Sequence, residues 1–317
     1  MRYIKQEIFS KIGKENQLKL YKSTVSVVGI GALGTILLDI LARSGIGKIK
    51  IIDRDIIELS NLQRQTLFTE EDLGKPKVVV GKEKISQINS EIDIEAHLID
   101  LDHDNINIIK SDLILDCTDN IYTRFLINEY SRKNNIPWIY TSVIGSKGMT
   151  MNVTKENPCF ACIFKEPRQA LETCDTYGVL NTTPHALAAI QATEAIKILT
   201  GQDYNKDLIY YDLWKNEINK IKIRKSKDCR VCNGIYSYLE GKKLKGTIKI
   251  CGSCNYQIKI DNINMEDLFN KLNKLNSIKT TDDCLILNDI IFFKTGRALV
   301  RAKTKEKAKA IIDRYLG

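Results

Sequence analysis

The chain has 317 residues, of which 43% are hydrophobic and 27% charged, a composition that is ordinary for a folded globular protein. This length accommodates one sizeable domain and a smaller one. The first 22 residues are charged and lack the apolar core of a secretory signal. The longest uncharged run, Ser23–Leu38, is too short to span a bilayer. These features predict a soluble cytoplasmic protein with no membrane partner.

The formal net charge of +9 is concentrated at the C-terminus, where residues 233–317 hold 16 Lys and Arg against 9 Asp and Glu. A basic region of this kind suits nucleic acid or an acidic protein partner. A general bias of the sequence toward lysine explains it equally simply, and we favour that interpretation. Because no basic motif with interleaved aromatic residues is present, we do not expect nucleic-acid binding.

The opening segment, residues 1–22, is predicted to be a helix because Ile4, Ile8 and Ile12 are spaced about four residues apart. After it comes an apolar strand around residues 25–28, which leads directly into a glycine-rich turn. An apolar helix and a second strand, residues 49–52, follow. This is the order of a nucleotide-binding βαβ unit.

Four residues of this unit are assigned to the nucleotide. Gly29 permits a tight turn, Gly31 lets the backbone approach a phosphate, and Gly34 lets the helix pack closely on the strand. The carboxylate of Asp53, 19 residues after Gly34, is placed to accept hydrogen bonds from ribose hydroxyls. This unit alone also fits an NAD-dependent oxidoreductase, which is the main alternative.

The next stretch distinguishes the two possibilities. Asn61, Arg64 and Gln65 follow within twelve residues of Asp53, and Lys77 comes shortly afterwards. A dinucleotide site does not need these groups, whereas fixed cations and amides can hold a triphosphate and stabilise charge at the α-phosphorus. The simpler alternative is that Arg64 and Lys77 are solvated loop charges.

The remaining pattern of elements predicts an α/β fold, a Rossmann-like doubly wound sheet. We expect strands around residues 92–98, 113–116, 138–143, 145–153, 209–214 and 218–223, and helices over 77–89, 121–134 and 186–199. Asp119 lies just beyond the strand at 113–116, on the side of the sheet where such folds bind ligands. It is a candidate Mg²⁺ ligand and also a candidate N-cap for the helix at 121–134, which Asp116 or Asn120 could share.

Six of the nine cysteines form three CxxC pairs, which favour metal or thiol chemistry over structural disulfides in an intracellular enzyme. Cys159 and Cys162 can join Cys229 and Cys232 in a tetrahedral zinc site. The 66 residues between the two pairs exceed an ordinary zinc ribbon, so spacing alone does not decide the matter. The third pair, 251 and 254, could be a redox pair, half of a metal site, or inert; we favour the last.

From residue 233 onward the pattern predicts a small α+β domain, which gives domains of 1–232 and 233–317. A helix is expected from Asn264 to about Leu275, and a hairpin at residues 288–289. A strand over 298–302 and a helix over 305–316, capped by Thr304, complete it.

Three motifs carry a family resemblance. Ser60–Gln65 (SNLQRQ), Gly74–Lys77 (GKPK) and Asp116–Asn120 (DCTDN) resemble the ThiF/MoeB/HesA family, relatives of the ubiquitin-activating enzymes. The resemblance runs from Arg2 to Cys232. A subset of that family also has a C-terminal region similar to this one, including a Gly-Arg-Ala-Leu segment at residues 296–299.

The resemblance implies an ATP- and Mg²⁺-dependent adenylyltransferase. Its substrate would be a ubiquitin-like β-grasp sulfur-carrier protein ending in Gly-Gly, whose C-terminal glycine becomes an acyl-adenylate with release of pyrophosphate. The resemblance assigns Arg64 and Lys77 to catalysis, Asp119 to Mg²⁺, and the first four CxxC cysteines to a structural zinc. Cys174 matches a cysteine that forms a covalent link in some members; we favour a non-essential surface thiol over that role.

Family members of this type are expected to be homodimers in which an N-terminal arginine enters the partner's nucleotide site. Lys5 stands at that position here, and Arg2 is the other candidate. A lysine keeps the charge but loses the bidentate fork. No rhodanese-like domain follows, so any sulfur donor is expected to be a separate protein. A non-catalytic scaffold that binds ubiquitin-like proteins is a third alternative, disfavoured because Arg64, Lys77 and Asp119 are all present.

Overall fold

The computed structural model describes residues 2–166, 177–243, 248–249, 255–260, 264–272, 278–280, 284–287, 290–294 and 296–316. The chain divides into two compact units, Met1–Lys243 and Leu244–Gly317.

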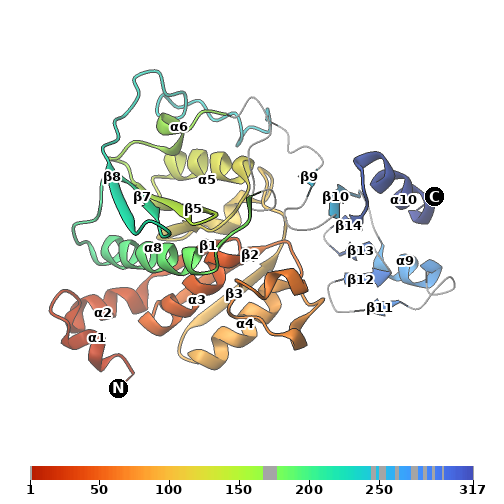
Figure 1. The fold of residues 1–317 in the computed structure, drawn as a ribbon, viewed down its shortest axis with the longest axis horizontal. Helices are drawn as coiled ribbons and strands as arrows, with labels where there is room; N and C mark the ends of the chain where they lie inside the picture. Colours follow the sequence, from red (N-terminus) through yellow and green to blue (C-terminus); the bar gives the residue numbers. More distant parts are fainter. Residues whose placement is uncertain are drawn as a thin grey trace. The chain divides into compact units, whose positions relative to one another are not determined.

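The first unit is built on an eight-stranded sheet of order β3-β2-β1-β4-β5-β6-β7-β8 (Figure 1). Its first five strands in this order are parallel, and β6, β7 and β8 are added antiparallel. The strands are β1 (Thr24–Val28), β2 (Lys48–Asp53), β3 (Asp93–Leu98), β4 (Leu113–Asp116), β5 (Trp138–Ile144), β6 (Lys147–Val153), β7 (Leu208–Asp212) and β8 (Glu217–Ile221). The predicted α/β architecture is confirmed.

Helices cover both faces of this sheet. One face packs against α3 (Ala32–Ser44), α4 (Lys77–Ile88) and α8 (Thr182–Thr200), and the other against α5 (Ile121–Asn134) and α6 (Phe160–Ile163) (Figure 1). Strands β1 and β4 are buried along most of their length because they lie at the centre of the sheet, which explains their nearly continuous apolar sequences.

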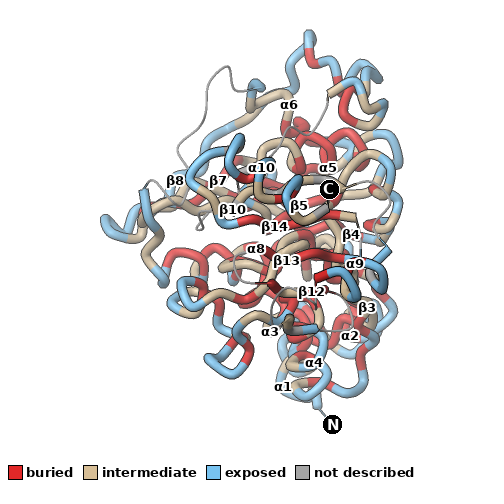
Figure 2. Tube along the Cα trace, turned by 90° about the vertical axis from the view of Figure 1, so that its right-hand side faces the viewer, coloured by how far each residue is buried: buried red, intermediate tan, exposed pale blue. Residues whose placement is uncertain are grey.

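The N-terminal segment differs from the single helix that was predicted. It forms two short helices, α1 (Ile4–Ile8) and α2 (Gly13–Lys22), separated by extended backbone at Phe9 and by Gly13, whose φ is +60°. The isoleucine spacing was misleading because the three side chains do not share a buried face. Ile12 is buried, whereas Ile8 is 68% exposed, and no residue of α1 is buried (Figure 2).

The stretch after the second CxxC pair packs with the first unit. The backbone N–H groups of Tyr238 and Leu239 donate to the carboxylate of Glu129 on α5, at 2.8 and 3.0 Å. The Tyr238 ring stacks on Phe125, with ring centroids 5.3 Å apart. These contacts keep residues 233–243 with the larger unit.

The second unit is a six-stranded antiparallel sheet of order β11-β12-β13-β14-β10-β9 with two helices, and the predicted α+β character is confirmed. Its elements are β9 (Ile248–Lys249), β10 (Asn255–Lys259), α9 (Met265–Leu272), β11 (Lys279–Thr280), β12 (Cys284–Leu287), β13 (Ile290–Phe293), β14 (Arg297–Arg301) and α10 (Lys305–Leu316). Asn264 and Thr304 cap α9 and α10 as predicted. Strands β12 and β13 pair antiparallel across the predicted hairpin, whose turn at 288–289 lies outside the described residues.

None of the helices in the described ranges is both long and apolar enough to cross a membrane.

Candidate active site

The glycine turn lies between β1 and α3, at the edge of the sheet where the parallel strands end. Gly29 has a φ of +93°, and a Cβ added to it would lie 2.8 Å from the carbonyl oxygen of Cys117. A Cβ on Gly34 would lie 2.0 Å from the oxygen of Gly29. Both positions therefore exclude a side chain, and the turn after β1 rests directly on the turn after β4.

Gly31 is different because the space beside it is open. A Cβ added there would meet no described atom closer than the Gln65 side-chain nitrogen, at 3.9 Å. Gln65 is buried, and its Oε1 has no hydrogen-bond partner among the residues that the structure describes. A buried amide oxygen without a partner costs free energy, so this position fits a ligand that donates to it.

Asp53 ends β2 and joins it to the glycine turn. One carboxylate oxygen accepts from the Ile30 N–H at 2.5 Å, and the other from the Asp55 N–H at 2.8 Å. Burial raises the pKa of the Asp53 carboxyl, and the charge of Lys77 opposes that shift. Both oxygens can accept further bonds, so the prediction that Asp53 binds a ribose stays open.

The loop after β2 is shaped by Asn61. Its buried side-chain oxygen accepts from the Glu58 backbone N–H at 3.1 Å. Its backbone carbonyl accepts from the backbone N–H groups of Arg64 and Gln65, both at 3.0 Å. A structural role for Asn61 is therefore established, and its predicted contact with phosphate is not tested. The Arg64 guanidinium is half-buried and donates one bond of 2.9 Å to the Ser60 carbonyl, leaving its remaining donors available.

Lys77 is the first residue of α4 and is only 6% exposed. Its ammonium lies 3.7 Å from a carboxylate oxygen of Asp55, and its N–H donates to the Asp55 carbonyl at 3.0 Å. A buried lysine held loosely by one carboxylate is not a solvated loop charge. The alternative that Lys77 simply faces solvent is therefore wrong.

The turn between β4 and α5 carries Asp119. Asn120 caps α5, because its side chain accepts from the Tyr122 N–H at 2.9 Å. Asp119 does not cap the helix: it is exposed, and within the part of the chain that the structure describes its carboxylate makes no hydrogen bond or ion pair. The capping alternative for Asp119 is thus not realised, and its carboxylate remains available to a cation.

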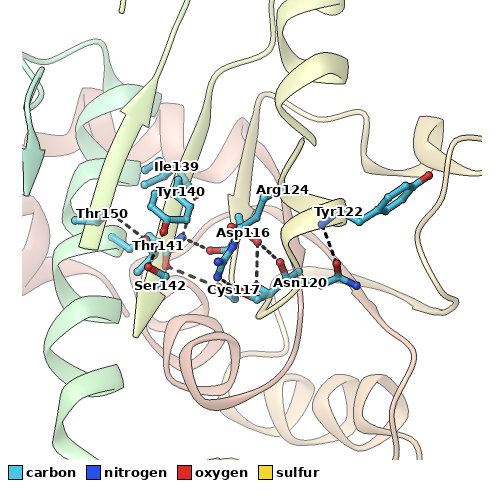
Figure 3. Close-up of polar contacts among 12 residues, drawn as sticks. Asp116, Cys117, Asn120, Tyr122, Arg124, Ile139, Tyr140, Thr141, Ser142 and Thr150 are labelled. Atoms are coloured by element: carbon cyan, nitrogen blue, oxygen red, sulfur yellow. Dashed lines mark hydrogen bonds and ion pairs between the residues drawn. The ribbon is translucent and has the colours of Figure 1, made fainter. Parts of the chain in front are cut away.

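Two buried arginines near this edge were not selected by sequence reasoning. Arg54, directly after Asp53, donates to the Asp100 carboxylate at 3.0 Å. Arg124 lies 3.3 Å from the Asp116 carboxylate, with its guanidinium 5.1 Å from the centre of the Tyr140 ring (Figure 3). The only sequence signal for these two arginines was that they lie close in sequence to Asp53 and Asp119. This signal is weak because arginine is common on exposed helix faces.

The four predicted zinc ligands come together. Cys159 and Cys162 lie on the turn that starts α6, and their sulfurs are 3.7 Å apart. Cys159 lies 3.5 Å from Cys229 and 3.6 Å from Cys232, and all four sulfurs lie within 4.8 Å of one another. Tetrahedral zinc with Zn–S bonds of about 2.3 Å separates its sulfurs by about 3.8 Å, so the set fits that ion.

The structure does not bring Lys5 or Arg2 to the edge of the sheet that carries the glycine turn. Lys5 is exposed on α1, and Arg2 donates to the Ile88 carbonyl at the end of α4 at 3.0 Å. Cys174 lies outside the described residues, as do the cysteines at 251 and 254, so the structure does not test their roles.

A doubly wound sheet with a glycine turn, fixed cations and an available carboxylate at one edge defines a nucleotide-using enzyme. Comparison with known proteins identifies the family: residues 3–231 match the ThiF family, and the chain belongs to it. It is an adenylyltransferase of the ThiF type. This finding leaves the oxidoreductase alternative without support.

The similarity to one relative extends over the whole chain, and the similarity to two others covers about three quarters of it. It is 32% identical to a sulfur carrier protein ThiS adenylyltransferase of Bacillus subtilis, covering 100% of this chain and 99% of that protein. It is also 32% identical to a SAMP-activating enzyme E1 of Haloferax volcanii, covering 73% of this chain and 88% of the relative. Among solved structures, MccB of Escherichia coli superposes with a TM-score of 0.66 at 25% identity, over 73% of this chain and 75% of that one.

Proposed function

We propose that this enzyme uses ATP to adenylate the C-terminal glycine of a ubiquitin-like sulfur carrier of the ThiS type. A carboxylate oxygen of the glycine attacks the α-phosphorus, the bond from that phosphorus to the β-phosphate oxygen breaks, and pyrophosphate leaves. The names of the relatives that cover most of this chain support this substrate class.

The observation that carries the proposal is the open space beside Gly31 under the unpartnered Gln65 amide. ATP would lie there with its phosphates against the glycine turn and the N-terminus of α3. Asp53 would accept from the ribose. In this pose a hydroxyl or amino group of the nucleotide, and not a phosphate, would donate to the unpartnered Gln65 Oε1, whereas the Gln65 Nε2 could donate to a phosphate oxygen.

Two cations then act on the reaction. Arg64 has guanidinium donors to spare, and Lys77 lies beside Asp55 in a buried position. Their charges would stabilise the negative charge that develops at the α-phosphate and on the departing pyrophosphate, which is usually the largest contribution to such rates. Asn61 holds both Arg64 and Gln65 through its carbonyl, so it would set their positions and contact phosphate through its amide.

Two metal ions complete the proposal. Asp119 would hold Mg²⁺, because its carboxylate has no partner within the described part of the chain and is a hard oxygen ligand of the kind this ion prefers. The ion would neutralise phosphate charge. Zinc would be held by Cys159, Cys162, Cys229 and Cys232, joining the start of α6 to the end of the domain; with four protein ligands it has no open position for catalysis.

We further propose that the enzyme acts in the cytoplasm as a homodimer, with a separate protein as sulfur donor. Helix α1 packs at the end of α3 remote from the glycine turn, where Gln6 donates to the Ser44 carbonyl at 3.0 Å. Since α3 has 13 residues, this end lies about 20 Å from the turn. Lys5 is therefore poorly placed to reach the nucleotide site of its own chain. We propose that it acts instead in the nucleotide site of the partner subunit.

The test is pyrophosphate–ATP exchange measured with and without Gly-Gly-ending carrier proteins encoded in the same genome. Exchange that depends on one carrier is the expected result and also identifies the pathway. Absence of exchange with every carrier, in zinc-replete protein that binds ATP, would refute this substrate class. The matched control is the same carrier without its last glycine, which should support no pyrophosphate–ATP exchange.

A further inference from the structure

The turn that carries Asp119 is held by an arginine that the proposed chemistry does not use. Arg124 lies one turn into α5, and helical side chains point back toward the N-terminus of their helix. Its Nε donates to the buried Asp116 carboxylate at 3.3 Å, and its Nη2 donates to the Thr118 carbonyl. One guanidinium thus ties the last residue of β4 to the residue that precedes Asp119.

The same turn is held by four further hydrogen bonds. The Asp116 carboxylate accepts from the N–H and the hydroxyl of Thr118, at 2.9 and 2.7 Å. The Cys117 N–H donates to the Val28 carbonyl at 2.8 Å, which fixes the turn to the end of β1. Asn120 caps α5 on the other side of Asp119. Asp119 is therefore an available carboxylate on a turn whose neighbouring residues on both sides are held by hydrogen bonds.

The Arg124 guanidinium carbon lies 5.1 Å from the centre of the Tyr140 ring (Figure 3). The Arg124 side chain is only 13% exposed. Burial alone would lower the pKa of Arg124, but Tyr140 and the carboxylates of Asp116 and Asp119 reverse this, so the guanidinium stays charged. A buried ion pair contributes little to stability compared with apolar packing of the same volume. Its presence beside the site calls for another reason.

We propose that Arg124 is a positioning residue, which fixes the Asp116–Asp119 turn so that Asp119 is presented to the Mg²⁺ that accompanies ATP. The inference rests on the proposed function of Asp119. In this assignment Arg124 acts through its contacts with Asp116 and Thr118, and not through contact with the nucleotide. Its planar fork serves two acceptors at once, which a lysine cannot do with the same geometry.

The turn also packs on the glycine turn, since a Cβ on Gly29 would meet the Cys117 carbonyl and the Thr118 nitrogen. Movement of Thr118 would consequently disturb the phosphate-binding backbone as well as Asp119. A misplacement of about 1 Å in such a site can lower the rate roughly 10²-fold.

The experiment uses the full chain and the variants Arg124→Lys and Tyr140→Leu, the second removing the ring that supports the guanidinium. ATP binding is measured by calorimetry while the Mg²⁺ concentration is varied, and hydrogen exchange is followed at the amides of Cys117, Thr118 and Tyr122. We expect both variants to need about tenfold more Mg²⁺ for half-maximal binding and to exchange these amides about tenfold faster.

Two reference variants separate positioning from general loss of structure. Asp119→Asn should need more Mg²⁺ while the turn amides keep their protection. Arg132→Lys removes an equivalent fork from the far end of α5, where Arg132 donates to the Lys155 carbonyl at 3.0 Å, and should change neither readout. If Arg124→Lys folds poorly, Tyr140→Leu gives the same test.

Unaltered amide protection in both Arg124→Lys and Tyr140→Leu would overturn the inference, and so would faster exchange without a change in Mg²⁺ requirement. An unaltered Mg²⁺ requirement in Asp119→Asn would remove the basis on which Arg124 is assigned. Failure of every carrier to support exchange would refute the proposed substrate only, since nucleotide binding and amide protection are measured without a carrier.

Discussion

The N–H of Ile30 donates to the carboxylate of Asp53 at 2.5 Å, so the last residue of β2 holds the glycine turn that follows β1. A second N–H, from Asp55, binds the other oxygen at 2.8 Å. The acid proposed to bind the ribose therefore also sets the shape of the loop that would bind the phosphates.

Replacement of Asp53 by asparagine tests this double role. An amide presents a donor where the carboxylate had an acceptor, so one of the two N–H groups loses its bond, at a cost of about 1–3 kcal/mol. We expect the Kd for ATP to rise roughly tenfold or more, measured by calorimetry. Asp93→Asn is the control because Asp93 begins β3 at the opposite edge and is exposed. ATP binding by Asp53→Asn equal to that of the native protein would contradict the prediction.

Arg64→Ala and Asp119→Ala should both abolish adenylate formation while the fold stays intact. Neither side chain is needed for packing, since Arg64 makes one bond to the backbone and Asp119 is exposed. Removal of a group that stabilises developing charge costs about 10²–10³ in rate. Pyrophosphate–ATP exchange measures adenylate formation, and circular dichroism tests whether the fold is intact. Arg43→Ala, which removes an exposed arginine paired with Asp39, is the control. Normal exchange by both site variants would refute the site assignment.

The sequence predicted the first unit well because its signals are local. The glycine turn and the apolar strands each depend on a few neighbouring residues. The four-cysteine site was predictable in composition, although its spacing was ambiguous until the fold brought Cys159 within 3.5 Å of Cys229.

The errors and omissions share a physical cause, which is tertiary contact. The spacing of Ile4, Ile8 and Ile12 suggested one helix, but only the fold decides which of them is buried. Arg124 was overlooked because its significance comes from Tyr140, a residue on a neighbouring strand. The choice of Asn120 over Asp119 as helix cap depends on backbone angles at the turn, which either residue type could adopt.

Asp72 provides a pH test in the loop that leads to Lys77. Burial acts to raise the pKa of its carboxyl, but hydrogen bonds from the Thr69 N–H and hydroxyl, with Lys84 and Lys75, outweigh it and lower the pKa below 3.8. The ionised form is therefore stabilising, and its contribution is lost as the pH falls through this lowered pKa.

We expect Asp72→Asn to be less stable than the native protein by about 1–2 kcal/mol near neutral pH. The difference should stay constant down to the ordinary pKa of 3.8 and shrink below it. Urea unfolding at several pH values measures it. The exposed neighbour Glu71 gives the control Glu71→Gln, for which no such change is expected. A difference that grows on acidification would have the wrong sign and would contradict the assignment.

The zinc prediction can be tested without measuring activity. Purified protein should contain one zinc ion per chain by elemental analysis, and Cys232→Ser should lose most of it. Loss of about 2–4 kcal/mol would lower the Tm by roughly 5–15 °C in a domain of this size. Cys284→Ala, which changes a buried cysteine of the second unit, should retain the metal. Full zinc content in Cys232→Ser would show that the four sulfurs do not act as one site.

Mixing two inactive variants tests whether Lys5 acts in the partner subunit. Lys5→Ala and Arg64→Ala homodimers should each be strongly impaired in pyrophosphate–ATP exchange. In a mixed dimer, the site on the Lys5→Ala chain has its own Arg64 and receives Lys5 from the other chain, so that site is complete. The second site of the dimer lacks Arg64. With random exchange of equal amounts of the two variants, about half of the dimers are mixed. Each mixed dimer has one complete site out of two, so activity should recover to about a quarter of the native value.

The result distinguishes a Lys5 that acts in the partner's site from a Lys5 that acts in the site of its own chain. In the second case, mixing the two variants cannot restore a complete site. If Lys5 served its own site, every site in the mixture would lack one of the two cations and no activity would return. Lys14→Ala, which removes another exposed lysine on the neighbouring helix α2, should be active alone and is the control for loss of charge. Full activity of Lys5→Ala itself would exclude both geometries. Because Arg2 is already bound to the end of α4, it would not then be a ready substitute.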